Sequence, residues 1–366
     1  MSSRQHKKHV SRGTYLFRRV IVVLILAAVV SLAFFGVKSV FNSNSVQTGP
    51  TTIPTTIPTT KPTTSSSVST TQVTSPSVPA NGGIGKYSVL LTSDVVKNTV
   101  GTSNFLIPTE IYYPSTTSRS SFPLIVFSQG FDISASNYST LEKQWSSAGF
   151  VVAIPTYPYT DPTQGSVNES DIVNHPSDLS AVISAVVVLN TTSDSPLFGL
   201  INTNEIGLIG HSDGGDVSLV SSVGSCCKIN TIKAAVILSG AELSSFGGSY
   251  FAGSESVPML LVQGTADTIN PPECSQQIYN EDPGPKFLLE LYGQGHQPPY
   301  LPPGPLPIVS NVSTLFLDSV LKHNSNAVTV MMQVASQDSA ASMVSTPTVS
   351  NLNGTCPGAP GDGAVG

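Results

Sequence analysis

Short apolar runs alternate with longer segments of helical periodicity from Lys86 onward. Several runs, among them PLIVF, FVVAI and AAVIL, are apolar throughout, as strands buried on both faces require. This alternation predicts an α/β fold with a mostly parallel central sheet of about eight strands and helices on both faces. The expected strands are 87–91, 109–113, 124–128, 151–155, 205–209, 233–238, 259–262 and 287–291, and the expected helices are 138–148, 177–189, 214–223 and 312–322.

A single long apolar run, residues 20–37, precedes this region and carries no ionisable side chain. As a helix it would span roughly 27 Å, which matches a bilayer core. Six Lys or Arg residues precede the run, so the positive-inside bias places residues 1–19 in the cytoplasm and the remainder outside. The sequence therefore predicts a single-pass anchor with an extracytoplasmic body. A cleaved signal peptide is the alternative, although its apolar region is usually shorter.

Residues 38–85 are dominated by Ser, Thr and Pro and include an IPTT repeat, a composition that favours an extended stalk over a packed core. The catalytic domain is expected over residues 86–345. The Gly- and Pro-rich residues 346–366 are expected to be a disordered tail.

Charge along the chain narrows the possible partners. Charged residues make up only 10% of the sequence, and from Asp94 onward twenty-two acidic residues face seven basic ones. Such a body repels phosphate backbones, which excludes nucleic acid, and it disfavours strongly anionic substrates. We expect a neutral ligand.

A G-x-S-x-G motif, residues 210–214, lies directly between an apolar strand and a predicted helix. Small residues two positions to either side of a serine permit the sharp turn that projects its hydroxyl above the sheet, at the positive end of a helix. The motif also occurs by chance in chains rich in Gly and Ser, where the serine is an ordinary turn residue. Its placement between strand and helix favours Ser212 as a nucleophile.

The histidine best placed to act as the base is His296, in a loop after the last long apolar strand, where catalytic groups concentrate. Solvent exposure is the plain alternative for a loop histidine. The remaining histidines have other expected places: His6 and His9 in the cytoplasmic segment, His211 packed beside the serine, His175 at a helix start or on the surface, and His323 at a helix end.

Asp267, at the tip of the MLLV strand, is the expected acid that orients this base. The order Ser, Asp, His along the chain is the one found in α/β-hydrolases. Glu255 and Asp282 fit less well because neither terminates a strand, and a turn aspartate is the alternative for Asp267.

The backbone N–H groups of Phe131 and Asp213 are the expected oxyanion donors, because one follows the 124–128 strand and the other follows the serine. Only about twenty residues separate the 233–238 strand from Met259, too few for a helical lid, so the site is expected to be open. An open cleft suits a bulky uncharged ester. The aromatic residues expected to line it, each of which packing would equally explain, are Phe131, Tyr157, Tyr159 and Tyr300.

Five segments carry a family resemblance: IYYP, PLIVFSQGFDISASNYSTLEKQWSSAGFVVAIPTYP, IGLIGHSDGG, MLLVQGTADTINPP and YGQGHQPPY. In this order they resemble the α/β-hydrolase superfamily, in particular its dienelactone hydrolase-like, chlorophyllase, platelet-activating-factor acetylhydrolase-like and cutinase-like serine esterases. The resemblance covers residues 86–345 and implies a triad of Ser212, Asp267 and His296. Dienelactone hydrolases carry cysteine at the position of Ser212, and cutinase-like polyester hydrolases usually carry Met where this chain has Asp213, a departure from the polyester-cleaving group.

These observations predict a membrane-anchored, extracytoplasmic serine hydrolase of carboxylic esters, acting as a monomer without cofactor or metal on a lipidic or polymeric ester. An envelope acyltransferase with the same triad and a non-catalytic binding module are the alternatives. In an exported chain the four cysteines can pair in three ways, and the sequence does not choose among them: Cys226, Cys227, Cys274 and Cys356.

Overall fold

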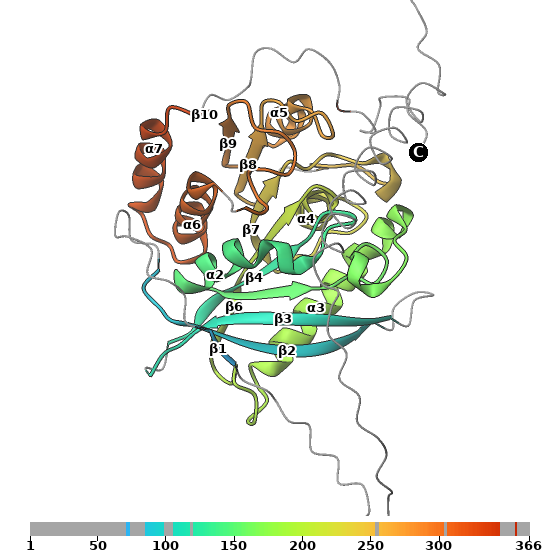
Figure 1. Ribbon diagram of the computed structural model, residues 1–366, viewed down its shortest axis with the longest axis vertical. Coiled ribbons are helices and arrows are strands. Elements are labelled where there is room, and N and C mark those ends of the chain that lie inside the picture. Colours follow the sequence, from blue (N-terminus) through green and yellow to red (C-terminus); the bar gives the residue numbers. More distant parts are fainter. Residues whose placement is uncertain are drawn as a thin grey trace, which may run out of the picture. The chain divides into compact units, whose positions relative to one another are not determined.

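A computed structural model (Figure 1) describes residues 71–73, 85–98, 105–117, 120–252, 256–303, 306–344 and 356. These ranges contain nearly all of the predicted catalytic domain. The predicted anchor at 20–37, most of the stalk and nearly all of the predicted tail lie outside the described residues, so those expectations stay predictions.

The described strands form one mixed sheet in the order β1-β2-β3-β5-β4-β6-β7-β8-β9-β10. Strands β4 to β9 run parallel, whereas β1, β2 and β3 at one side and β10 at the other pair antiparallel with their neighbours. Their bounds are β1 Thr71–Val73, β2 Val89–Asn98, β3 Phe105–Pro114, β4 Phe122–Ser128, β5 Val151–Pro155, β6 Ile201–His211, β7 Ile232–Leu238, β8 Met259–Gly264, β9 Lys286–Leu291 and β10 Ala341–Val344. The eight predicted strands correspond to β2 through β9, and the mostly parallel α/β sheet is confirmed.

Helices cover both faces of the sheet (Figure 1). The α-helices are α2 Ser139–Ser147, α3 His175–Leu189, α4 Asp213–Val223, α5 Pro272–Glu281, α6 Pro307–Leu321 and α7 Ala327–Gln337, with short 3-10 turns η1 Ala135–Tyr138, η2 Pro162–Gln164, η3 Glu169–Asn174 and η4 Ser244–Phe246. Helices α2 and α6 pack with one buried cluster of strand side chains, and α3, α4 and α5 pack with those on the opposite face. The sequence pattern did not predict α5 and α7.

The continuous apolar runs are the interior of this sheet. Every residue of β4, β5 and β8 is buried, which is the pattern required of strands covered on both faces. Between β7 and β8 the described residues contain only the 3-10 turn η4, so no helical lid is found in that part of the chain. The carboxyl ends of the parallel strands are where the site residues lie.

Among the described residues, the stretch Glu169–Leu189 is long and apolar enough to cross a membrane. It comprises η3 and α3, and α3 packs on β2, β3, β5 and α4 through a buried face that includes Leu179, Val182 and Val186. We therefore assign its apolar composition to the core of this domain. It is not the segment predicted as an anchor.

Candidate active site

Ser212 occupies a tight turn between β6 and α4, with the unusual backbone angles φ 55° and ψ −125°. A positive φ at a non-glycine residue is strained, and such strain is characteristic of functional turns. Glycine is required on both sides of this turn: a side chain at Gly210 would collide with the carbonyl of Gly214, and one at Gly214 would collide with the carbonyl of Ser128. The motif thus forms the predicted strand-turn-helix geometry.

The imidazole of His296 lies between Ser212 and Asp267. Its Nε2 is 2.7 Å from the Ser212 hydroxyl oxygen, and its Nδ1 is 2.8 Å from Oδ2 of Asp267. A carboxylate only accepts, so in the neutral ring Nδ1 carries the hydrogen and Nε2 is the lone pair that accepts from the serine hydroxyl. The structure therefore brings together all three residues that the sequence nominated.

Four donors hold the Asp267 carboxylate, which is only 3% exposed. Oδ2 accepts from His296 and, at 3.3 Å, from the side-chain amide of Gln263. Oδ1 accepts from the backbone N–H groups of Ile269 and Asn270, at 2.9 and 3.1 Å. These donors fix the carboxylate plane facing the imidazole and compensate the burial of its charge.

The loop that carries Asp267 and the loop that carries His296 are joined by a backbone hydrogen bond. The N–H of Ala266 donates to the carbonyl of Gln294 at 2.8 Å. A side chain at Gly264 would collide with that same carbonyl, so the two loops approach closely because residue 264 is glycine. This contact explains how two side chains distant in sequence meet.

The two residues expected to donate to an oxyanion flank the serine. Asp213 follows it as the first residue of α4, and Gly130, which precedes Phe131, packs so closely that an added Cβ would lie 3.2 Å from Cβ of Ser212. The segment after β4 is therefore held against the turn that carries Ser212. Their role as oxyanion donors remains a prediction.

Asp216, one helical turn into α4, is a buried acid near the site. Burial, and then the charge of Asp213, raises the pKa of this carboxyl well above its usual range. Its Oδ1 accepts the N–H of Ala241, so it ties α4 to the segment after β7. Asp216 therefore supports the helix that begins after Ser212 and is not one of the three candidate catalytic residues.

The aromatic residues expected to line the cleft divide into two pairs. Phe131 is half-buried and Tyr159 is 40% exposed, with its ring edge-on to Phe105. Tyr157 and Tyr300 are fully buried, so the expectation that they contact substrate is wrong for this structure. Their hydroxyls are used inside the protein, since Tyr157 bonds to the Ser128 hydroxyl and Tyr300 donates to the Val262 carbonyl.

The structure corrects the expectation for His175 and locates His323 and the two weaker candidate acids. His175 begins α3 as expected, but it is 1% exposed and stacks on Tyr157 with ring centroids 4.1 Å apart, so it is a core residue and not a surface one. His323 is exposed and its Nε2 lies 2.9 Å from a Glu205 oxygen. Asp282, the weaker candidate acid, caps the far end of α5, and Glu255 lies outside the described residues.

The family comparison agrees with this geometry. The model of the PETase family, described as PET hydrolase-like, matches residues 85–300. The chain belongs to this family. PET hydrolase-like proteins are cutinase-like serine ester hydrolases of the α/β-hydrolase superfamily, so the resemblance seen in the sequence motifs is confirmed. The matched span of this PET hydrolase-like domain contains Ser212 and Asp267 and ends just beyond His296.

Sequence reasoning did not nominate several residues that lie near the three candidate catalytic residues. Gln263 gives no motif signal, and Tyr138 looks like an ordinary core aromatic. Ile269, whose side chain is 49% exposed, donates its backbone N–H to Asp267, and the only hint in the sequence was its place in the loop after the MLLV strand. Among the described residues, no group of three or more His, Cys, Asp or Glu side chains is arranged to hold a metal ion.

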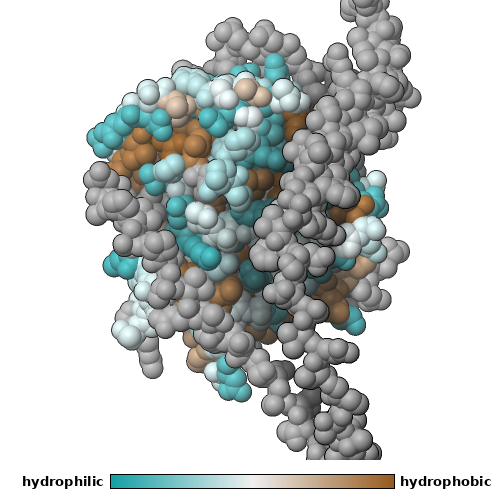
Figure 2. All heavy atoms as spheres, in the orientation of Figure 1, coloured by the Kyte–Doolittle hydropathy of each residue, from teal (hydrophilic) through white to brown (hydrophobic). Residues whose placement is uncertain are grey.

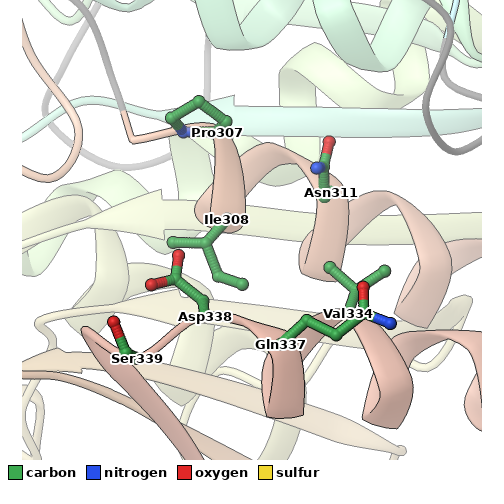
Figure 3. A pocket seen from close by; sticks show the side chains of 7 residues that line it. All are labelled: Pro307, Ile308, Asn311, Val334, Gln337, Asp338 and Ser339. Atoms are coloured by element: carbon green, nitrogen blue, oxygen red, sulfur yellow. The ribbon is translucent and has the colours of Figure 1, made fainter.

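One surface pocket of about 320 Å³ lies between α6 and α7 (Figure 3). Figure 2 shows apolar surface on the side of the domain where these two helices lie. None of the triad residues lines this pocket, so it is separate from the candidate active site. Its lining residues are Pro307, Ile308, Asn311, Val334, Gln337, Asp338 and Ser339.

The described cysteines form two disulfides, Cys226–Cys227 and Cys274–Cys356. The pairing that the sequence left open is thus assigned, and it includes the bond between adjacent residues. Cys274 lies in the first turn of α5, close after the Asp267 loop, and Cys356 is buried against it with Ala241. The second bond therefore holds residue 356 near the edge of the sheet that carries the site.

Proposed function

We propose that the protein is a membrane-anchored, extracytoplasmic serine esterase that cleaves carboxylic esters through a covalent acyl-enzyme. The observation that carries the proposal is the continuous contact from the Ser212 hydroxyl through His296 to Asp267, at 2.7 and 2.8 Å. Membership of the PET hydrolase-like family supports the same reaction class.

In the first half-reaction, Nε2 of His296 takes the hydroxyl proton as the Ser212 oxygen attacks the ester carbonyl. The N–H groups of Phe131 and Asp213 stabilise the resulting oxyanion. His296 then gives its proton to the departing alcohol, leaving an acyl group on Ser212. Water, deprotonated by His296, attacks this acyl-enzyme, and the acid is released as the serine recovers its proton. Asp267 stabilises the imidazolium formed in both steps.

The substrate we propose is a neutral ester, lipidic or polymeric. The acidic body disfavours anionic substrates, and half-buried Phe131 with exposed Ile269 offers apolar surface beside the triad. The extracytoplasmic location is supported by the apolar run at 20–37 and by the two disulfides, because such bonds persist in oxidising compartments.

The test is hydrolysis of p-nitrophenyl esters of graded acyl length by the full chain and by Ser212→Ala. We expect Ser212→Ala to lose all but background activity and labelling by a fluorophosphonate probe, with unchanged circular dichroism. Ser221→Ala is the matched control, because this buried serine on α4 has no hydrogen-bond partner for its side chain among the described residues. Full activity of Ser212→Ala would overturn the proposal.

Three further experiments test acyl transfer, polymer cleavage and the anchor. An added acceptor alcohol distinguishes hydrolysis from acyl transfer, because a transferase would form the new ester faster than the free acid. Incubation with an aromatic polyester film tests whether Asp213, in the position after the nucleophile, is compatible with polymer cleavage. Detection of the uncleaved N-terminus in the membrane fraction tests the anchor.

A further inference from the structure

The hydroxyl of Tyr138 joins the segment after β4 to His211, the residue before Ser212. Tyr138 is fully buried, and its hydroxyl oxygen is 2.7 Å from Nδ1 of His211 and 3.2 Å from the backbone nitrogen of Gly130. On the other side of the same imidazole, Nε2 of His211 is 2.9 Å from the carbonyl oxygen of His296. One chain of hydrogen bonds therefore runs from residue 130 to residue 296.

The donor and the acceptor of each hydrogen bond in this chain can be assigned. A carbonyl oxygen only accepts, so Nε2 of His211 must be the donor to His296. Burial, and then the nearby His296, holds the pKa of His211 well below its usual range, so the ring is neutral and Nδ1 is an acceptor. Tyr138 must then donate to Nδ1, and its oxygen accepts the N–H of Gly130.

The ring of His211 is enclosed by the groups around it. Its centroid lies 4.7 Å from that of Tyr300, 4.9 Å from that of His296 and 5.7 Å from that of Tyr138, and none of its surface is exposed. These three are the titratable side chains in ring contact with it. Because the ring is packed and both nitrogens are used, one orientation and one tautomer are selected.

We propose that Tyr138 and His211 are positioning residues that set the spacing between the Gly130–Phe131 segment and the imidazole of His296. The inference rests on the proposed function, in which Phe131 donates to the oxyanion while His296 moves the proton. Both groups must be aligned with oxygens of the same tetrahedral intermediate, and a displacement of about 1 Å can cost roughly 100-fold in rate. The hydrogen-bond chain connects the two groups without touching substrate.

The decisive variant is Tyr138→Phe, which removes the hydroxyl and leaves the ring. We expect kcat for a p-nitrophenyl ester to fall about 10-fold with KM within about twofold, because transition-state alignment is lost and ground-state binding is not. The rate of Ser212 labelling by a fluorophosphonate should fall in parallel. His211→Gln, whose amide can still donate toward the His296 carbonyl, should retain more kcat than His211→Ala.

Tyr250→Phe is the matched control. The Tyr250 hydroxyl also accepts a backbone N–H, that of Leu243 at 2.9 Å, and donates to a carbonyl, that of the same residue. This variant should lose a similar amount of thermal stability and keep the wild-type kcat. If Tyr138→Phe keeps wild-type kcat, or if both variants lose kcat equally, the positioning role is overturned.

The same assays keep this inference apart from the proposed function. If the wild type shows no Ser212-dependent hydrolysis or labelling, the esterase proposal fails. If that activity is present and Tyr138→Phe does not reduce it, only the positioning role fails. If Tyr138→Phe does not fold, the two His211 variants become the test. Equal kcat values for folded His211→Gln and His211→Ala would then overturn the positioning role.

Discussion

Asp267 and His296 are 29 positions apart in the chain, yet Oδ2 of one lies 2.8 Å from Nδ1 of the other. Each residue follows a neighbouring strand, β8 or β9, so the sheet delivers them to the same edge. The backbone bond from Ala266 to Gln294 then fixes the two loops together. The contact between Asp267 and His296 therefore depends on β8 and β9 being neighbours in the sheet more than on either loop alone.

Replacing Asp267 by Asn should reduce kcat by about 10³- to 10⁴-fold, because the amide favours the wrong tautomer of the imidazole. The measurement is p-nitrophenyl ester hydrolysis at neutral pH, with folding checked by thermal melting. Asp282→Asn is the control, since this buried acid caps the far end of α5 and should leave kcat unchanged. Equal activities of the two variants would contradict the role of Asp267.

We expect Gln263 to affect kcat through its contact with Asp267. Its amide nitrogen lies 3.3 Å from Oδ2 of Asp267 and 3.0 Å from the Asn270 carbonyl, and its oxygen accepts from the Ser275 hydroxyl at 2.7 Å. Gln263→Met keeps the volume and removes these bonds, so we expect kcat to fall about 10-fold, a barrier increase of ~1.4 kcal/mol. Ser275→Ala removes only the bond farthest from the acid, and a comparable fall in its kcat would contradict this account.

Glu242 should make folding stability depend on pH. Burial, and then the charge of Glu281, raises the pKa of this carboxyl to about 8. Between the ordinary carboxyl range and that value the folded protein binds more protons than the unfolded chain, so stability falls as pH rises toward 8 and levels off above it. Urea unfolding from pH 5 to 9 would measure this.

The Glu242→Gln variant should flatten that pH dependence and be more stable than wild type at pH 8.5, by several kcal/mol. Glu281→Gln removes only the smaller of the two causes and should change the curve less. A wild-type curve that rises between pH 5 and 8, with no difference in Glu242→Gln, would show that this carboxyl is ionised without cost in the fold.

Removing the Cys274–Cys356 disulfide should destabilise the protein far more than removing Cys226–Cys227. The first bond closes a separation of 82 residues and the second a separation of one. A chain-entropy estimate for the larger loop is about 4 kcal/mol, whereas the adjacent pair restricts the unfolded chain very little. Paired Cys→Ser substitutions compared by thermal melting check this, and equal melting temperatures would refute it.

Much of the fold was readable from the sequence because its signals are local. The apolar runs that became β4, β5 and β8 are buried on both faces, and the glycines around Ser212 are demanded by the turn itself. Helix α5 was missed because its sequence, PECSQQIYNE, is mostly polar and buries few side chains, among them Ile278 and Tyr279. Such a helix is stabilised by packing and by its disulfide more than by periodicity.

The side chains around the three candidate catalytic residues were harder to predict, because the direction in which a side chain points depends on tertiary packing. Tyr157 and Tyr300 follow strands in the same manner as exposed loop aromatics, yet both point inward and use their hydroxyls in the core. His211 was expected to pack, and it does so while also bonding to His296. No spacing rule links positions 138, 211 and 296.

The bond between Cys274 and Cys356 also sets a condition on biosynthesis. It cannot close until the polypeptide has been made through position 356, so the domain passes through an uncrosslinked stage while it emerges. A reducing cytoplasm would leave both thiols free, and expression there would yield material whose C-terminal segment lacks its covalent tether. Production in a periplasm or another oxidising compartment is therefore the appropriate route to the crosslinked enzyme.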